Sequence, residues 1–125
     1  MWRDAAYLLD ILLAGRRAQE FTAALTLDAF RASQLHQHAV MRNLEIVGEA
    51  ARKVSRTTKE AHTEIPWSDL VGLRNRLVHE YFRIDVDKVW DVVVNNLPAL
   101  LAAVEPLVVF SFLEGFSPKP AVDLE

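Results

Sequence analysis

The chain has 125 residues, of which 51% are hydrophobic, and these values fit one globular domain with a single modest core. It contains no cysteine, which excludes disulfides and thiolate metal sites, and its formal net charge of −3 excludes an overall basic field that attracts nucleic acid. The charge is uneven, because residues 40–83 carry a net charge of +2 and residues 84–125 a net charge of −5. The middle of the chain is therefore the candidate for phosphate contact. The alternative is that this small positive surplus arises by chance on an ordinary solvated surface.

The first predicted helix begins near Asp4, a plausible N-cap, and carries apolar residues at three- and four-residue steps. The residues of this apolar face are Ala5, Leu8, Leu9, Leu12 and Leu13. The pattern can continue through Phe21 to Leu25, after which Thr26 or Asp28 can cap a short helical turn around residues 29–31.

A second long helix is predicted after Ser33, which can cap it. Its heptad-like apolar stripe consists of Val40, Leu44, Val47, Ala51 and Val54. Helices that pack side by side in a bundle need this spacing. The polar residues 55–64 then interrupt the pattern.

A third helix is predicted from about Trp67, because the preceding Pro66 suits the first turn of a helix. Residues 83–85 break the pattern, and Asp85 can cap the last helix. The apolar positions of that helix are Val86, Val89, Trp90, Val93, Leu97, Leu100, Leu101, Val104, Leu107 and Val108. We expect Pro98 and Pro106 to kink or divide it, because each removes an internal hydrogen bond.

These elements predict an all-α fold, an up-and-down bundle of four or five helices. Gly115 is the expected stop, so the bundle occupies residues 1–115 and a flexible tail occupies residues 116–125. No uninterrupted apolar stretch of about 18 residues occurs, so no membrane-spanning helix is expected. With no cysteine and no signal-peptide pattern, we expect a cytoplasmic protein.

Four polar residues crowd one broad face of the third predicted helix: Arg74, Asn75, His79 and Tyr81. A continued helix would place Arg74 and Tyr81 on one stripe and Asn75 and His79 on the neighbouring one. One interpretation is structural, with Arg74 paired to a carboxylate such as Glu49 while Asn75 and His79 satisfy each other. The other is a site that carries chemistry.

The spacing Arg74-x4-His79-x-Tyr81 resembles the motif of HepT-type toxins, which have the HEPN fold, and Asn75 matches the asparagine that commonly follows the arginine. Three further blocks resemble the same family in the same order: residues 42–51, residues 65–67, and the pairs Val89-Trp90 and Leu97-Pro98. The similarity covers roughly residues 3–110.

The resemblance implies a HEPN-type bundle and a metal-independent endoribonuclease that acts as a homodimer and needs no cofactor. Arg74 and His79 would be catalytic and Asn75 supporting. The chemistry suits the residue types, because an imidazole can give or take a proton near neutral pH and a guanidinium matches phosphate with two donors. A two-fold dimer would supply two histidines, one as base and one as acid.

The resemblance gives Tyr81 a regulatory role, within a type VII-like toxin–antitoxin system. The expected antitoxin is an MntA-like nucleotidyltransferase that transfers AMP to the motif tyrosine and so blocks RNA. The structural alternative is an aromatic lid over the end of the helix. For the whole chain, the alternative is a non-catalytic HEPN module that binds RNA or recruits a nucleotidyltransferase.

Four cations are possible RNA contacts: Arg76, Arg52, Lys53 and Arg56. The last three lie near the end of the second helix, where cations also stabilise the helix terminus. His36 and His38 are two residues apart and point to different sides of a helix, so both are expected at the surface. No metal site is expected.

Overall fold

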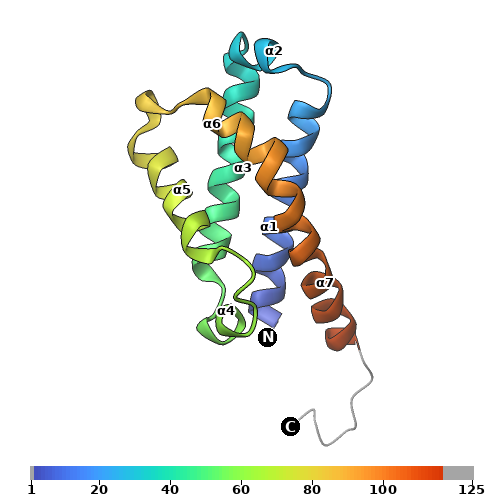
Figure 1. Ribbon diagram of the computed structural model, residues 1–125. Coiled ribbons are helices and arrows are strands. Elements are labelled where there is room, and N and C mark those ends of the chain that lie inside the picture. The colour runs from blue at the N-terminus through green and yellow to red at the C-terminus, as the bar shows by residue number, and fades with distance from the viewer. Residues whose placement is uncertain (1, 117–125) are drawn as a thin grey trace, which may run out of the picture.

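The computed structural model of the chain describes residues 2–116, and among these residues it contains helices and no strand (Figure 1). The predicted all-α class is confirmed. Two short 3-10 and π turns, η1 (Tyr81–Arg83) and η2 (Val92–Asn96), adjoin the α-helices. The α-helices are α1 (Trp2–Ala23), α2 (Leu27–Arg31), α3 (Gln34–Lys53), α4 (Arg56–Ala61), α5 (Trp67–His79), α6 (Val86–Asp91) and α7 (Leu97–Phe116).

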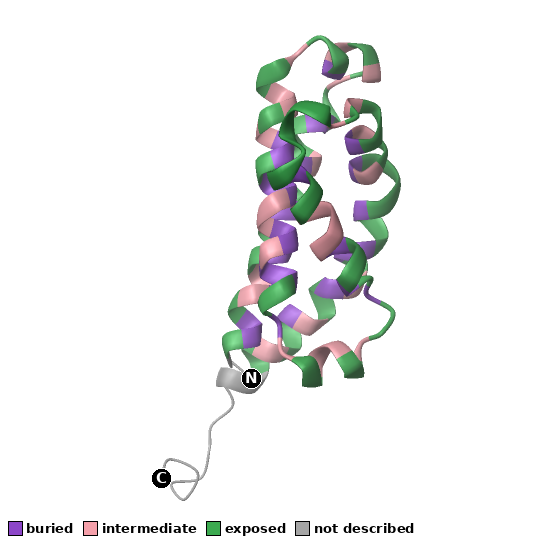
Figure 2. Cartoon of the chain, turned by 90° about the vertical axis from the view of Figure 1, so that its left-hand side faces the viewer, coloured by how far each residue is buried: buried purple, intermediate pink, exposed green. Residues whose placement is uncertain are grey.

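The long helices pack side by side in the order α5, α3, α1, α7, with the short helices α2 and α4 at opposite ends (Figure 1). Buried side chains lie along the inward faces of these helices (Figure 2). Every residue of the predicted stripe on α3 is buried, so that prediction is confirmed. On α1 the face is rotated slightly from the prediction, because Ile11 is buried and Leu13 is exposed.

Three predicted helix caps are confirmed by hydrogen bonds. The Thr26 hydroxyl accepts from Ala29 N, and the Ser33 hydroxyl accepts from His36 N. The Asp85 carboxylate accepts from Asp87 N at the start of α6. These caps place the starts of α2, α3 and α6 where the sequence indicates.

Asp4 is not an N-cap, because α1 already begins at Trp2. Its side chain is almost fully buried and accepts hydrogen bonds from Ser55 Oγ at 2.6 Å, Ser55 N at 3.0 Å and Thr58 Oγ1 at 2.6 Å. Burial acts to raise the pKa of Asp4, but these hydrogen bonds outweigh it and hold the pKa below its usual value. Asp4 therefore ties α1 to the start of α4, which Ser55 caps.

The C-terminal run stays helical past both prolines, from α6 through η2 to α7. The turn η2 precedes Pro98, and Leu97 N donates to Val92 O across this wider turn. Four buried residues lie four positions apart along this run, namely Val89, Val93, Leu97 and Leu101. Because an α-helix has 3.6 residues per turn, the wider π turn helps keep them on one face. Pro106 lies inside α7, which continues past it, so the expected division is wrong.

The run from Val86 to Leu113 is, by length and composition alone, long and apolar enough to cross a membrane, and an 18-residue window within it has a mean hydropathy of 1.8. This differs from the expectation drawn from uninterrupted apolar stretches. The core helix of a soluble protein passes the same test, and α7 packs against α1. α7 ends at Phe116, one residue beyond the predicted stop. Residues 117–125, assigned to the tail, lie outside the described residues.

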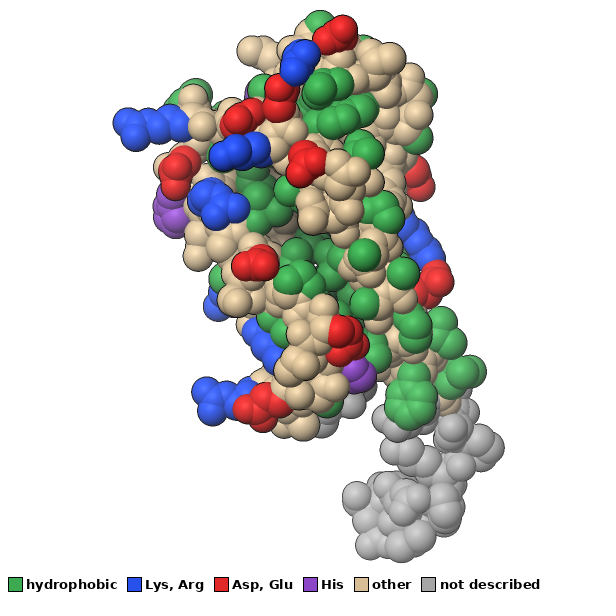
Figure 3. Space-filling model, in the orientation of Figure 1, with side chains coloured by type: hydrophobic (Ala, Val, Ile, Leu, Met, Phe, Trp, Pro, Cys, Tyr) green, Lys and Arg blue, Asp and Glu red, His purple; other side chains and the backbone are tan. Residues whose placement is uncertain are grey.

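Charged side chains are distributed unevenly over the surface (Figure 3). Lys and Arg side chains gather mainly along the edge formed by α5 and the segment that follows it, interspersed with Asp and Glu, whereas hydrophobic side chains cover the lower end of α7 (Figure 3). Ion pairs link distant elements, among them Arg31 with Asp87 at 2.7 Å, between α2 and α6, and Arg16 with Glu105, between α1 and α7.

Candidate active site

The motif helix α5 is anchored to the bundle by three buried residues, Trp67, Leu70 and Leu77. The Trp67 indole N–H donates to His62 O at 3.0 Å, which fixes the start of the helix. Leu70 and Leu77 are two helical turns apart and face the core, so the opposite side of α5 is available to polar residues.

Gly48 on α3 allows α5 to approach closely at the motif arginine. A Cβ atom at Gly48 would overlap Arg74 Cβ and would lie 2.6 Å from Leu70 O. Real Cβ atoms do not approach a backbone oxygen that closely. The two helices therefore cross with a glycine directly beneath Arg74, and this crossing sets where the arginine leaves α5.

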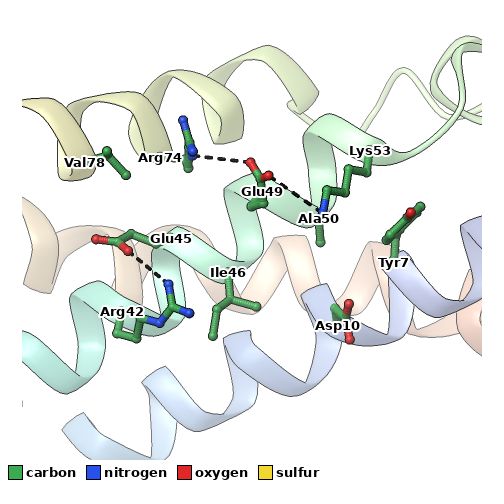
Figure 4. Close-up of a pocket in the computed structure, with 10 residues that line it drawn as sticks. All are labelled: Tyr7, Asp10, Arg42, Glu45, Ile46, Glu49, Ala50, Lys53, Arg74 and Val78. Carbon is green, nitrogen blue, oxygen red and sulfur yellow. Dashed lines mark hydrogen bonds and ion pairs between the residues drawn. The ribbon is translucent and has the colours of Figure 1, made fainter.

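The guanidinium of Arg74 is held by two neighbours. Its Nε lies 3.4 Å from Glu49 Oε1 on α3 (Figure 4), and its Nη1 donates to Asn75 Oδ1 at 3.0 Å. The arginine side chain is 28% exposed, so part of it remains available to a ligand. The pairing with Glu49 that the sequence suggested is confirmed. This pairing leaves part of the Arg74 side chain exposed to solvent.

Glu49 is the centre of a small ionic cluster. It accepts from Arg52 Nε at 3.1 Å and Nη2 at 2.9 Å, and it lies 3.8 Å from Lys53 Nζ. The hydrogen bonds from Arg52 hold the pKa of Glu49 below its usual value, and the charges of Arg52, Arg74 and Lys53 act in the same direction. Glu49 therefore stays ionised and keeps an anion beside Arg74.

Arg74 faces a cavity of about 300 Å³ between α1, α3 and α5 (Figure 4). The cavity has charged walls of both signs, because Asp10, Glu45 and Glu49 lie opposite cations. The cations that line it are Arg42, Lys53 and Arg74. A guanidinium next to a solvent-filled cavity can meet an anionic oxygen without leaving its protein partners.

His79 is the last residue of α5 and its side chain is exposed. No side-chain hydrogen bond or ion pair within residues 2–116 involves the His79 imidazole, so Asn75 and His79 do not satisfy each other. Five residues along an α-helix correspond to a rotation of about 140°, so Arg74 and His79 of one chain project in clearly different directions. One chain thus presents the two motif side chains separately rather than as a joined pair.

Tyr81 does not share a stripe of α5 with Arg74, because α5 ends at His79 and Tyr81 begins the turn η1. That prediction is wrong. Glu80, at the helix end, leaves the helical conformation with φ −119° and ψ 34°, and this redirects the chain. The Tyr81 ring lies 5.5 Å from the His38 ring of α3 and 5.3 Å from the Phe82 ring, measured between centroids.

Comparison with known proteins identifies the family. The family model for "Ribonuclease HepT-like" matches residues 11–107. The chain belongs to the HepT-like ribonuclease family. A protein of Methanocaldococcus jannaschii, provisionally named an RNase, is 38% identical over 80% of this chain and 92% of its own length. A protein of Thermococcus cleftensis, named probable ribonuclease HepT, is 38% identical over 81% of this chain and 92% of its own length. No solved structure matches the chain.

The four cations proposed for RNA contact lie in different places: Arg52 and Lys53 are near Arg74, because both pair with Glu49 and Lys53 lines the same cavity, whereas Arg76 and Arg56 lie elsewhere. Arg52 is held by Glu49, and Lys53 lies 5.9 Å from the centroid of the Tyr7 ring. Arg76 lines a different cavity on the other side of α5, and Arg56 is exposed at the start of α4. In the described part of the chain, no three His, Asp or Glu side chains gather as metal ligands.

Sequence reasoning missed two features of this HepT-like site. His38 is exposed as expected, but it faces Tyr81, a contact across 43 residues of chain that helical periodicity does not reveal. Gly48 carried no turn signal, because it sits inside a helix, and its role depends on the crossing with α5. The exposed Phe82 next to the motif was the available signal for an aromatic cluster here.

Proposed function

We propose that this chain is a metal-independent endoribonuclease in which Arg74 and His79 promote attack of RNA's own 2′-hydroxyl on the adjacent phosphorus. Membership of the HepT-like ribonuclease family, together with the part-exposed Arg74 on its anionic anchor, carries this proposal. Relatives named as ribonucleases align with most of the chain, which supports nuclease activity over a purely binding role.

The proposed reaction balances in one displacement. A His79 imidazole removes the 2′-hydroxyl proton, and the oxygen forms a bond to phosphorus while the bond from phosphorus to the 5′-oxygen breaks. The leaving 5′-oxygen takes a proton from a second histidine, and Arg74 stabilises the negative charge on the phosphorane oxygens. The products are a 2′,3′-cyclic phosphate and a 5′-hydroxyl.

The test incubates purified protein with single-stranded RNA in the presence of a chelator. We expect cleavage to persist, with 2′,3′-cyclic phosphate ends, and Arg74→Ala and His79→Ala each to lose roughly 10²-fold or more. His62→Ala, a histidine outside the motif, is the matched control and should cleave normally. Activity that disappears with chelator and returns with Mg²⁺ would contradict the mechanism. Binding of RNA without any cleavage would favour the non-catalytic alternative.

We further propose that Tyr81 is the site at which a nucleotidyltransferase partner silences the enzyme, as in a toxin–antitoxin pair. Tyr81 is 38% exposed, which favours access by a second protein. In the reaction, the phenol oxygen bonds to the α-phosphorus of ATP, pyrophosphate leaves, and the phenol proton passes to a base. The added AMP brings a negatively charged phosphodiester and an adenine ring close to the motif.

Co-expression with a cognate nucleotidyltransferase should add one or more AMP masses to the wild-type chain and abolish RNA cleavage. Tyr81→Phe should keep most of its activity, because the hydroxyl is not the proposed base, yet escape silencing. Intact-mass spectrometry measures the adduct, with Tyr7→Phe as the control tyrosine. An inhibited protein that carries no added mass would show that the partner acts by occlusion.

A further inference from the structure

A second cavity lies beside the motif, between the N-terminal half of α3 and the residues that follow α5. Its volume is about 430 Å³, which falls within the range of roughly 300–1,000 Å³ typical of small-ligand sites. Gln34, Gln37 and His38 line it from α3, and Tyr81 and Phe82 line it from η1. It is distinct from the cavity that Arg74 faces.

The wall formed by η1 is aromatic. The Tyr81 and Phe82 rings meet edge to face, at 87° and 5.3 Å between centroids, and the His38 ring lies 5.5 Å from the Tyr81 ring. The Phe82 side chain is 97% exposed, so it contributes nothing to the core. A single exposed apolar residue needs no explanation. Three adjacent rings bordering one cavity provide flat faces on which another ring can stack.

The polar wall consists of amides. Gln37 donates from Nε2 to Phe30 O at 2.8 Å and to Arg31 O at 3.0 Å, so its amide is held in a fixed orientation with Oε1 as the remaining acceptor. Gln34, the first residue of α3, is exposed and offers both a donor and an acceptor. Amides of this kind match the mixed donor and acceptor edges of nucleobases.

Charge also distinguishes this cavity. None of the residues that line it is a carboxylate. Four other cavities in the described chain each include at least one carboxylate, such as Glu49 beside Arg74 or Asp85 near Arg76. A strand of RNA brings a phosphate with every base, so a cavity free of anions accepts a nucleotide with little repulsion.

We propose that this cavity is a nucleobase subsite, in which an unpaired base of RNA stacks on Phe82 and Tyr81 while its edge meets the amides of Gln34 and Gln37. The subsite depends on the proposed ribonuclease function, because RNA is taken as its ligand. Proteins recognise single-stranded RNA mainly in this way, by stacking on aromatic rings and by polar contacts to base edges. Because Tyr81 follows His79 by two residues, the base that binds here would neighbour the phosphate that is cut.

The test measures binding of a short fluorescent single-stranded RNA in a His79→Ala background, so that cleavage does not consume the probe. Phe82→Ala and His38→Ala should weaken binding, and Phe82→Ala by roughly 5- to 100-fold, the range for losing one stacked base. Phe82→Trp should retain affinity. Leu35→Ala is the matched control, because Leu35 is 77% exposed on the same helix and does not line the cavity.

Light scattering of the same variants separates this proposal from a contact with a second copy of the chain. A Phe82→Ala protein that binds RNA as the parent does, or that changes its assembly instead of its RNA affinity, would overturn the subsite. If the His79→Ala parent binds no RNA at all, the proposed function fails. Binding of AMP, followed by NMR, then tests the subsite on its own. NMR shifts at His38 and Phe82 with AMP, but not with ribose 5-phosphate, would sustain it, and equal responses to both would overturn it.

Discussion

Arg74 depends on its neighbours for its position, and Glu49 is the neighbour that acts through charge. The carboxylate lies 3.4 Å from Arg74 Nε and is kept ionised chiefly by the hydrogen bonds from Arg52. A guanidinium with an anion on one side presents its remaining N–H groups in a fixed direction. Glu49 is therefore a positioning residue, distinct from the groups that touch RNA.

We expect Glu49→Gln to lower kcat about tenfold while leaving KM and the melting temperature nearly unchanged, because the ion pair with Glu49 orients the Arg74 guanidinium, whereas a partly exposed ion pair contributes little to stability. Steady-state cleavage kinetics measure this split. Glu45→Gln is the matched control, since Glu45 lines the same cavity but pairs with Arg42 at 3.3 Å. If Glu49→Gln and Glu45→Gln lowered kcat equally, Glu49 would not be the residue that positions Arg74.

At the scale of elements, much of the bundle could be predicted from the sequence because its signals are local. The caps at Ser33 and Asp85 and the apolar stripe of α3 each depend on residues within one helix. The end of α5 could not be predicted, because no glycine or proline marks it and the turn that follows packs Tyr81 against His38. Asp4 was misassigned for the same reason, since its partners lie more than 50 residues away.

The link from Asp4 to α4 predicts a pH-dependent contribution to stability. Asp4→Asn should lower the free energy of unfolding by about 2 kcal/mol at neutral pH, because the buried carboxylate accepts several hydrogen bonds. The folded-state pKa lies below the ordinary value of 3.8, so this stabilisation is present above that value and is lost as pH falls through the folded pKa.

Urea denaturation at neutral pH and at progressively lower pH checks this expectation. The difference between wild type and Asp4→Asn should shrink below pH 3.8, while Asp10→Asn, which alters an exposed carboxylate on the same helix, should match wild type throughout. A difference that stays constant with pH would mean that Asp4 contributes through packing and not through its charge.

At the scale of the whole molecule, the proposed mechanism needs more than a single chain presents. Arg74 and His79 project in different directions, and the mechanism requires both a base and an acid. The family and the two motif residues could be predicted from sequence, because the motif is continuous. The angular separation of the two side chains could also be predicted, from the rotation of about 140° over five helical residues, whereas the end of α5 at His79 and the new direction of Tyr81 could not.

We expect the active species to be a homodimer whose two-fold axis passes near α5, so that the histidines of both chains reach one phosphate. Light scattering should give twice the chain mass of 14.2 kDa, and specific activity should fall when the protein is diluted below the dissociation constant of the dimer. Full activity from a monomer at micromolar concentration would show that one chain suffices.

The glycine beneath Arg74 also matters for anyone who wishes to stabilise this protein by engineering. Replacing a helical glycine by alanine usually adds up to about 1 kcal/mol of stability, so both Gly48 and Gly72 look like suitable positions. They are not equivalent, because a methyl group at Gly72 would meet nothing within 4 Å, whereas one at Gly48 would press α5 away from α3. The same substitution is therefore favourable at Gly72 and unfavourable at Gly48, only 24 residues away. Thermostability could be raised at Gly72 without disturbing Arg74, whose position depends on Gly48.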